Sequence, residues 1–271
     1  MTFEAIFIAT TIAVSLVFLI YASWSDHKTR EVSNWVWAVY GPIALTLSLA
    51  ELLLYDPTKL ILFGASAGFT VGLAFLLFYS GAFGGADSKA LMCIALALPF
   101  APVTLFTPLL ADSLSPIAQF MFPLTIFSNA VLFAAVSGVY MILHNFVWHK
   151  KNGKEMFTGT LAHESPWKKL IILITGYKVT VGKLKEKWHV FPMEDLDDGE
   201  NALQRKLVVV PRDEGRDKIV ERLSNAVQAG RIDTYVWATP GLPMLIFITL
   251  GLIVALLCGD IVWLLVRFFL G

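Results

Sequence analysis

Apolar residues lie in six long blocks along the chain, and most charged residues lie between these blocks. A helix needs about 20 residues to cross a hydrocarbon core about 30 Å thick, and each block comes close to that length. Because the blocks are continuously apolar and do not alternate as barrel strands do, they predict transmembrane helices. The expected helices are Thr2 to Trp24, Asn34 to Leu54, Leu60 to Tyr79, Lys89 to Leu110, Phe120 to Trp148, and Pro243 to about Phe269.

A polar stretch, residues 149–236, separates the fifth block from the sixth. Charge density rises sharply there and no apolar run could span a bilayer, so we expect a small mixed α/β domain on the cytosolic side. Leu207 to Val210 and Arg231 to Trp237 are expected as strands, and apolar residues recur at helical spacing between Ile219 and Val227.

The predicted fold class is therefore an α-helical polytopic membrane protein with six transmembrane helices and one inserted soluble domain. The expected divisions are residues 1–148 for the first five helices, 149–236 for the soluble domain and 237–271 for the sixth helix. Composition agrees, because 56% of residues are hydrophobic and 15% charged, far from the usual mix of a soluble domain. Membrane lipid is an expected partner, and nucleic acid is not.

The two cysteines, Cys93 and Cys258, both lie inside apolar blocks. They lack the CxxC or Cys/His spacing that a metal site or a disulfide framework needs. We interpret both as small core residues, and we expect neither a metal nor a cofactor.

The distribution of lysine and arginine predicts the orientation of the helices. With the N-terminus outside, Lys59 and Arg267 are the only two of the 21 basic residues that fall outside. The short loops alone favour this orientation, which places residues 149–236 in the cytosol.

Two aspartates, Asp26 and Asp87, are expected at the same face of the membrane. Helix one runs outside to inside and ends at Asp26, while helix four runs inside to outside and begins after Asp87. Either acid alone is more often a solvated helix cap. The run Gly81 to Ala86 shifts the balance, because small residues let the backbone bend tightly and let a substrate chain come close.

Two segments of the chain resemble the motifs of a known family. Gly84-Gly85-Ala86-Asp87, followed by Ser88-Lys89-Ala90, resembles the glycine–aspartate signature of archaeal preflagellin and type IV prepilin peptidases, which are relatives of presenilin-type GxGD proteases. Asp26 with Lys28, Arg30, Val32 and Asn34 resembles the first aspartate motif of the same family. The chain departs from the strict GxGD form at Ala86, and it lacks the cysteine-rich loop of many bacterial members, so product methylation is not expected.

The resemblance implies an aspartic endopeptidase whose catalytic residues are Asp26 and Asp87. Its expected substrates are preflagellin or prepilin-like membrane proteins, which lose an N-terminal leader at the cytosolic face. Residues expected to support the motifs are Gly84, Gly85, Lys28, Arg30, Asn34 and Lys89. Two carboxylates can share one proton, so that one activates water while the other polarises the scissile carbonyl.

An acidic cluster in the soluble domain comprises Glu194, Asp195, Asp197 and Asp198. Such a cluster is usually a solvated loop. The alternative is that it attracts substrate, since substrates of the family carry basic residues just before the cleavage point.

Two further functions stay open. In a proton-coupled transporter or channel, Asp26 and Asp87 would relay protons, although matched discontinuous helices and an internal repeat are not evident in the sequence. In a membrane assembly protein, the soluble domain would act and the aspartates would be inert.

Overall fold

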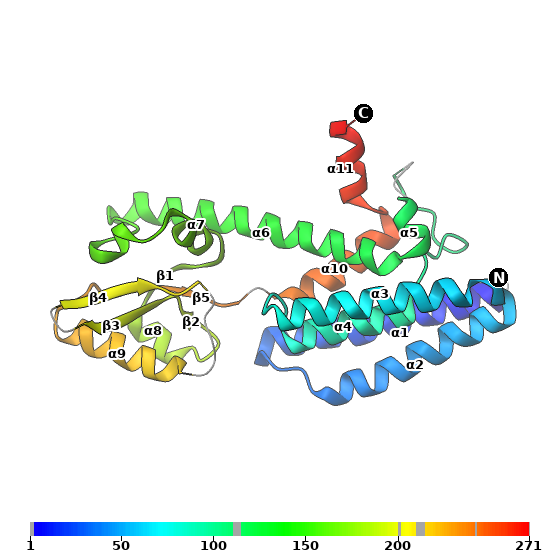
Figure 1. Ribbon diagram of the computed structural model, residues 1–271, viewed down its shortest axis with the longest axis horizontal. Coiled ribbons are helices and arrows are strands. Elements are labelled where there is room, and N and C mark those ends of the chain that lie inside the picture. Colours follow the sequence, from blue (N-terminus) through cyan, green and yellow to red (C-terminus); the bar gives the residue numbers. More distant parts are fainter. Residues whose placement is uncertain (1–2, 111–114, 200–201, 210–214, 242, 271) are drawn as a thin grey trace. The chain divides into compact units, whose positions relative to one another are not determined.

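The computed structural model describes residues 3–110, 115–199, 202–209, 215–241 and 243–270. The chain forms two compact units, labelled by element in Figure 1: the helical unit, residues 1–134 and 243–271, and the mixed unit, residues 135–242. Helix α6 begins in the first unit and ends in the second.

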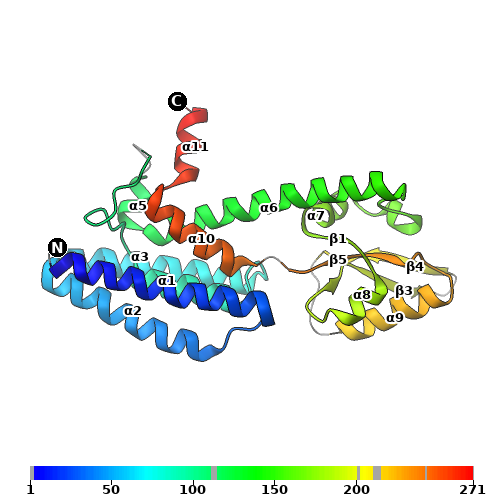
Figure 2. The ribbon, with the colours of Figure 1, turned by 180° about the vertical axis from the view of Figure 1, so that it is seen from behind.

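The helical unit is built around a short central helix, α4, which contacts four neighbours, α1, α2, α3 and α10. Figures 1 and 2 both show α1 to α4 side by side. The fully buried side chains of Leu19, Tyr40, Ile94 and Leu252 belong to the core between these helices. The elements are α1 (Phe3–Thr29), α2 (Asn34–Tyr55), η1 (Pro57–Lys59), α3 (Leu60–Tyr79), α4 (Gly85–Ala97), α5 (Pro116–Phe120), α6 (Phe122–Asn152), α10 (Met244–Leu257) and α11 (Ile261–Leu270).

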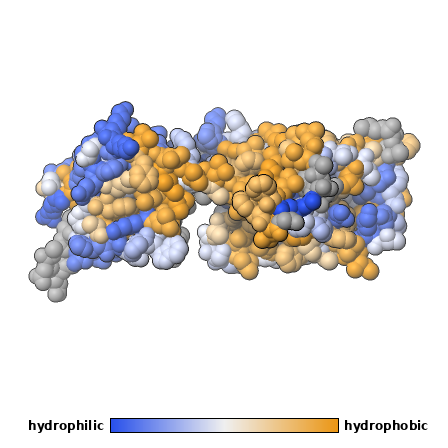
Figure 3. Space-filling view, turned by 90° about the horizontal axis from the view of Figure 1, so that it is seen from above, coloured by the Kyte–Doolittle hydropathy of each residue, from blue (hydrophilic) through white to orange (hydrophobic). Residues whose placement is uncertain are grey.

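Among the described residues, four helices are long and apolar enough to cross a membrane: α1, α2, α3 together with η1, and α6. A fifth is added if α10 and α11, which are bent by 67° at a break, count as one span. Figure 3 shows apolar side chains over much of the visible face of the helical unit, as expected of helices that contact lipid. The chain is therefore a multi-pass membrane protein, and six spans stay a prediction.

The fourth expected helix, Lys89 to Leu110, is shorter in the structure. Helix α4 begins at Gly85 and ends at Ala97, and its 13 residues make a rod about 20 Å long. It ends there because Pro99 disfavours helical geometry at Leu98, which has φ −131° and ψ 67°. Pro102 and Pro108 then keep the following segment out of a helix.

The last expected helix is also interrupted, since Pro243 to Phe269 is divided into α10 and α11. Gly259, between them, has φ +83°, a left-handed conformation that glycine adopts without steric cost.

The mixed unit contains two antiparallel sheets, one of three strands in the order β1-β5-β2 and one hairpin of β3 and β4. Helix α9 contacts β3 and β2, and it packs against α8. The elements are η2 (Gly159–His163), α7 (Pro166–Thr175), β1 (Tyr177–Thr180), α8 (Val181–Glu186), β2 (Phe191–Pro192), β3 (Glu194–Gly199), β4 (Ala202–Leu207), α9 (Arg216–Gln228) and β5 (Tyr235–Thr239).

The expected helix between Ile219 and Val227 is confirmed as α9, whose buried face includes Val220 and Leu223. The two expected strands are shifted along the chain. Strand β4 ends where Leu207 to Val210 was expected to begin, and Val210 lies outside the described residues. Strand β5 begins at Tyr235 instead of Arg231, because α9 is followed by a turn at Gly230, where φ is +67°.

Candidate functional site

Asp26 lies in the last turns of α1, with 18% of its side chain exposed. The guanidinium of Arg30 lies 4.0 Å from its carboxylate, and the Arg30 N–H donates to the Asp26 carbonyl at 2.9 Å. Arg30 has φ +54°, which turns the chain out of the helix. The Ser25 hydroxyl then donates to the Glu31 carbonyl at 2.8 Å and holds this turn against the helix end.

Asp87 lies in the first turn of α4 and caps that helix. The Gly84 N–H donates to its Oδ2 at 3.0 Å, and the Ser88 hydroxyl donates to the Gly84 carbonyl at 3.2 Å. The partial positive charge of a helix N-terminus lowers the cost of a negative charge at this position. The cap fixes where the carboxyl group lies at the start of α4.

The structure brings the two aspartates together. Helices α1 and α4 pack against each other, and Asp87 lies within electrostatic reach of both Asp26 and Arg30. When two carboxyl groups interact, a negative charge on one disfavours a negative charge on the other, and such a pair can share one proton. Such a pair can act as a general acid and a general base in turn.

Among the motif residues, Lys89 and Asn34 have a definite structural role. The Lys89 ammonium donates to the Asn34 side-chain oxygen at 2.6 Å and so ties the first turns of α4 to the first residue of α2. Lys28 lies on α1, with its ammonium 5.0 Å from the centroid of the Trp24 ring. Lys89 thus positions the helix that carries Asp87.

Gly84 provides close approach, and its backbone dihedrals are ordinary. Its φ of −71° and ψ of 164° suit any residue, and the left-handed glycine of this loop is Gly81, at φ +75°. A Cβ added to Gly84 would lie 3.1 Å from the Asp87 carboxylate, tighter than ordinary contact. A Cβ on Gly85 would meet Phe78 at 3.7 Å, which is ordinary contact.

Gly84→Val is therefore expected to lower activity about 10-fold or more, because the added side chain displaces the Asp87 carboxylate, and a misplacement of about 1 Å can cost about 100-fold. Gly85→Val should lose less, since its Cβ has room. Gly72→Val in α3, where a Cβ meets no atom within 4 Å, is the matched control and should stay within a few-fold. Initial rates of the purified variants measure this, and equal activity for Gly84→Val and Gly72→Val would contradict it.

The acidic cluster is mostly paired within the mixed unit. Glu194 is fully buried, and its carboxylate accepts from Lys178, from Arg205 and from the Trp237 N–H at 2.7 Å. Asp195 pairs with Arg222 at 2.7 Å, and Asp197 with Lys206 at 3.0 Å. The side chain of Asp198 lies outside the described residues. Asp195 and Asp197 are thus more accessible to a substrate than Glu194.

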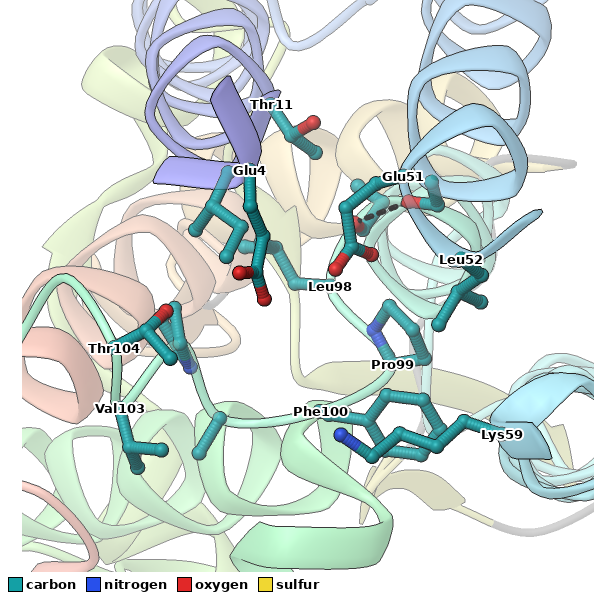
Figure 4. Close-up of a pocket in the computed structure, with 15 residues that line it drawn as sticks. Glu4, Thr11, Glu51, Leu52, Lys59, Leu98, Pro99, Phe100, Val103 and Thr104 are labelled. Carbon is teal, nitrogen blue, oxygen red and sulfur yellow. Dashed lines mark hydrogen bonds between the residues drawn. The ribbon is translucent and has the colours of Figure 1, made fainter. Parts of the chain in front are cut away.

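A second pair of carboxylates, Glu4 and Glu51, was missed in the sequence. Both point into a cavity of about 110 Å³ that is also lined by Lys59 and Phe100 (Figure 4). Glu4 lies 22 residues before Asp26 on the same helix, a separation of about 33 Å. Each of these two acids lies alone in an apolar stretch, so their spacing in the sequence does not indicate that they lie close together. Among the described residues, no three His, Cys, Asp or Glu side chains cluster as metal ligands would.

Two sequence families match the chain. The model of the "Type IV leader peptidase family" matches residues 13–143, which include both Asp26 and Asp87. The model of the "Archaeal Peptidase A24 C-terminus Type II" matches residues 168–261, which include most of the mixed unit and α10.

Two curated relatives are similar over most of their length. The preflagellin peptidase of Methanococcus voltae is 28% identical over 254 residues, which cover 92% of this chain and 94% of the relative. The preflagellin peptidase of Methanococcus maripaludis is 28% identical over 247 residues, which cover 89% of this chain and 92% of the relative.

Proposed function

Because the chain belongs to the type IV leader peptidase family, we propose that it is an aspartic endopeptidase with Asp26 and Asp87 as its catalytic pair. The observation that carries this proposal is that the two carboxylates lie within electrostatic reach of each other, on packed helices. The match to the leader peptidase family covers the helices that hold both groups.

In the proposed reaction, one ionised carboxylate removes a proton from a water molecule, which attacks the scissile carbonyl. The other carboxyl group, protonated, donates to the carbonyl oxygen as the tetrahedral intermediate forms. The intermediate then collapses, the C–N bond breaks, and a proton passes to the leaving amine. Arg30, beside Asp26, stabilises the ionised state of the pair.

The proposed substrates are preflagellin or prepilin-like membrane proteins, cleaved after a short N-terminal leader. In the proposed orientation, the N-terminus of the enzyme lies outside, and the mixed unit and both aspartates lie at the cytosolic face. A leader rich in basic residues would then meet Asp26 and Asp87 at the side where it is synthesised.

Incubation with a leader-bearing preflagellin-like protein tests this function. Purified enzyme in detergent micelles should yield a new substrate N-terminus, identified by mass spectrometry, just after the basic end of the leader. A substrate whose basic residues are changed to alanine is the matched control and should be cleaved more slowly. An uncut substrate with well-folded enzyme would reject the proposal.

Charge on the β3 strand is proposed to attract the leader. Changing Asp195, Asp197 and Asp198 together to asparagine should raise the KM for a basic leader a few-fold and leave kcat nearly unchanged. Glu194 is excluded from this variant because it is buried in an ion-pair network. The difference in KM should fade with added salt, since the screening length is about 8 Å at physiological ionic strength. An unchanged KM at low salt would contradict a role for these residues in attracting the leader.

A further inference from the structure

The break between α10 and α11 changes the direction of the chain by 67°. Helix α10 packs along α1 and α4, and the Ser23 and Thr249 hydroxyls join α1 to α10 at 2.8 Å. Its far end, Leu257, accepts a hydrogen bond from the Leu109 N–H at 2.7 Å. Helix α10 therefore packs against the bundle, and α11 turns away from it, as Figure 1 shows.

The break is held by a buried side chain from α6. Asn129 is fully buried, and its amide donates to the Gly259 carbonyl at 2.9 Å. Its side-chain oxygen accepts from the Ile261 N–H at 3.1 Å. One asparagine thus satisfies backbone groups on both sides of the break, and groups of this kind are costly to leave unpaired away from water.

Asp260 completes the break from within. It is buried, and its carboxylate accepts from the Trp263 N–H at 3.0 Å, which caps the start of α11. The Thr125 hydroxyl lies 3.4 Å from its other oxygen. A continuous helix through Gly259 would lose these contacts, and the Asp260 carboxylate would lose the Trp263 N–H as its partner. The bend is therefore a feature of the fold.

Helix α11 is apolar apart from Arg267, and none of its ten residues is buried. At 100° per residue, Trp263 and Arg267 share one face, while Leu265 and Phe269 lie on the opposite face. Leu265 is 41% exposed and Phe269 is 77% exposed. Tryptophan and arginine suit the headgroup level of a bilayer, and leucine and phenylalanine suit acyl chains.

We propose that α11 is an in-plane membrane helix, bound to the lipid leaflet at the end of the bundle where α1 begins. Residues 97–104 line the cavity that contains Glu4, near the start of α1. Residues between 101 and 108 also lie beside Ala255 and Leu256, at the end of α10. The end of α10, and therefore α11, lies at the end of the bundle where α1 begins. The bundle helices cross the membrane, and Figures 1 and 2 both show α11 running across the direction of α1 to α4, which brings α11 closer to the membrane plane than to its normal. Leu265 and Phe269 face the acyl chains, and Trp263 and Arg267 face the headgroups.

Lipid suits this helix better than a second copy of the chain. A stable protein interface buries about 800 Å² on each partner, and a ten-residue helix about 15 Å long offers only part of that area. An unbroken span is disfavoured by the Asn129 and Asp260 contacts at the break.

Spin-label depth measurements test the proposal. In full-length protein without Cys93 and Cys258, a nitroxide is placed at each position from 261 to 270 in turn, in phosphatidylcholine–phosphatidylglycerol vesicles. The ratio of collisions with oxygen to collisions with a water-soluble nickel chelate reports depth. Labels at Ile61, Phe69 and Leu76, exposed along the spanning helix α3, calibrate the scale.

The ratio should oscillate with a 3.6-residue period and be several-fold higher at Leu265 and Phe269 than at Trp263 and Arg267. A steady change of depth along α11, like that along α3, would overturn the proposal in favour of an unbroken span. Low collision rates with both reagents, together with spin–spin broadening that vanishes on dilution with unlabelled protein, would overturn it in favour of a second copy. In Asn129→Ala the oscillation should weaken, while labels on α3 keep their depths.

Discussion

Asp26→Asn and Asp87→Asn should each lower the rate of leader cleavage by about 10³-fold or more, because general acid–base catalysis by a positioned side chain contributes about 10²–10⁴-fold. An amide has nearly the same shape as a carboxyl group but cannot move a proton. At position 87 the asparagine oxygen can still accept from the Gly84 N–H, so the cap of α4 is kept. Single-turnover rates, with melting curves of the purified variants, measure the effect.

Asp56→Asn removes another membrane-boundary carboxylate, paired with Lys59 at 2.9 Å on the exposed surface, and should stay within a few-fold of the wild type. Because Asp26 and Asp87 are expected to act as one unit, the double variant should be no slower than the slower single variant. Appreciable turnover by either folded single variant would contradict the assignment of Asp26 and Asp87 as the catalytic pair.

Glu194→Leu should destabilise the mixed unit by about 3–5 kcal/mol, the usual cost of removing one partner from a buried ion pair. The substitution leaves Lys178 and Arg205 without their shared carboxylate, and their side chains are only 4% and 9% exposed. It also leaves the buried Trp237 N–H unpaired. Denaturant titration followed by tryptophan fluorescence measures the free energy of unfolding, and limited proteolysis reports on the mixed unit.

Asp197→Ala is the matched control, because Asp197 and Lys206 form an ion pair on the same hairpin whose side chains are 65% and 46% exposed. It should cost about 0–1 kcal/mol. Equal losses for the two variants would show that burial does not govern this network.

The loss of unfolding free energy in Glu194→Leu should also depend on pH. Burial lowers the pKa of Lys178, with Glu194 opposing that shift. The unfolded chain therefore holds this proton more tightly than the folded protein, and the lysine opposes folding below its unfolded pKa of about 10.4. Unfolding free energy should rise as pH increases between the lowered folded pKa and that value, more steeply in the variant. A flat profile would contradict the assignment.

Long apolar runs in the sequence predicted most of the helices. Because successive spans alternate in direction, the sequence also placed Asp26, at the end of the first, and Asp87, at the start of the fourth, at the same face of the membrane. Their proximity in the structure follows from this alternation of direction and from the packing of α1 on α4. The end of α4 at Ala97 was not predicted, although Pro99 was visible, because composition alone does not distinguish an apolar coil from an apolar helix.

Contacts between distant residues were beyond the sequence. The bend at Gly259 depends on Asn129, which lies 130 residues earlier, and Glu194 is buried only because Lys178, Arg205 and Trp237 meet it. In the sequence, Glu194 is one of several neighbouring acids, a pattern more typical of a solvated loop.

The shortness of α4 affects hydration inside the bundle. Ser48, seven residues before the end of α2, donates to the carbonyl of Ala97 at 2.6 Å, so α4 stops about 10 Å below that end of α2. The cavity of about 110 Å³ adjoins this point, and it is large enough for several water molecules. Glu51 lies within the second apolar block of the sequence, which is expected to span the membrane. In the structure it faces this cavity, which can hold water, instead of hydrocarbon. A longer α4 would fill that hollow and impose on Glu51 the desolvation cost that charged groups incur in a bilayer.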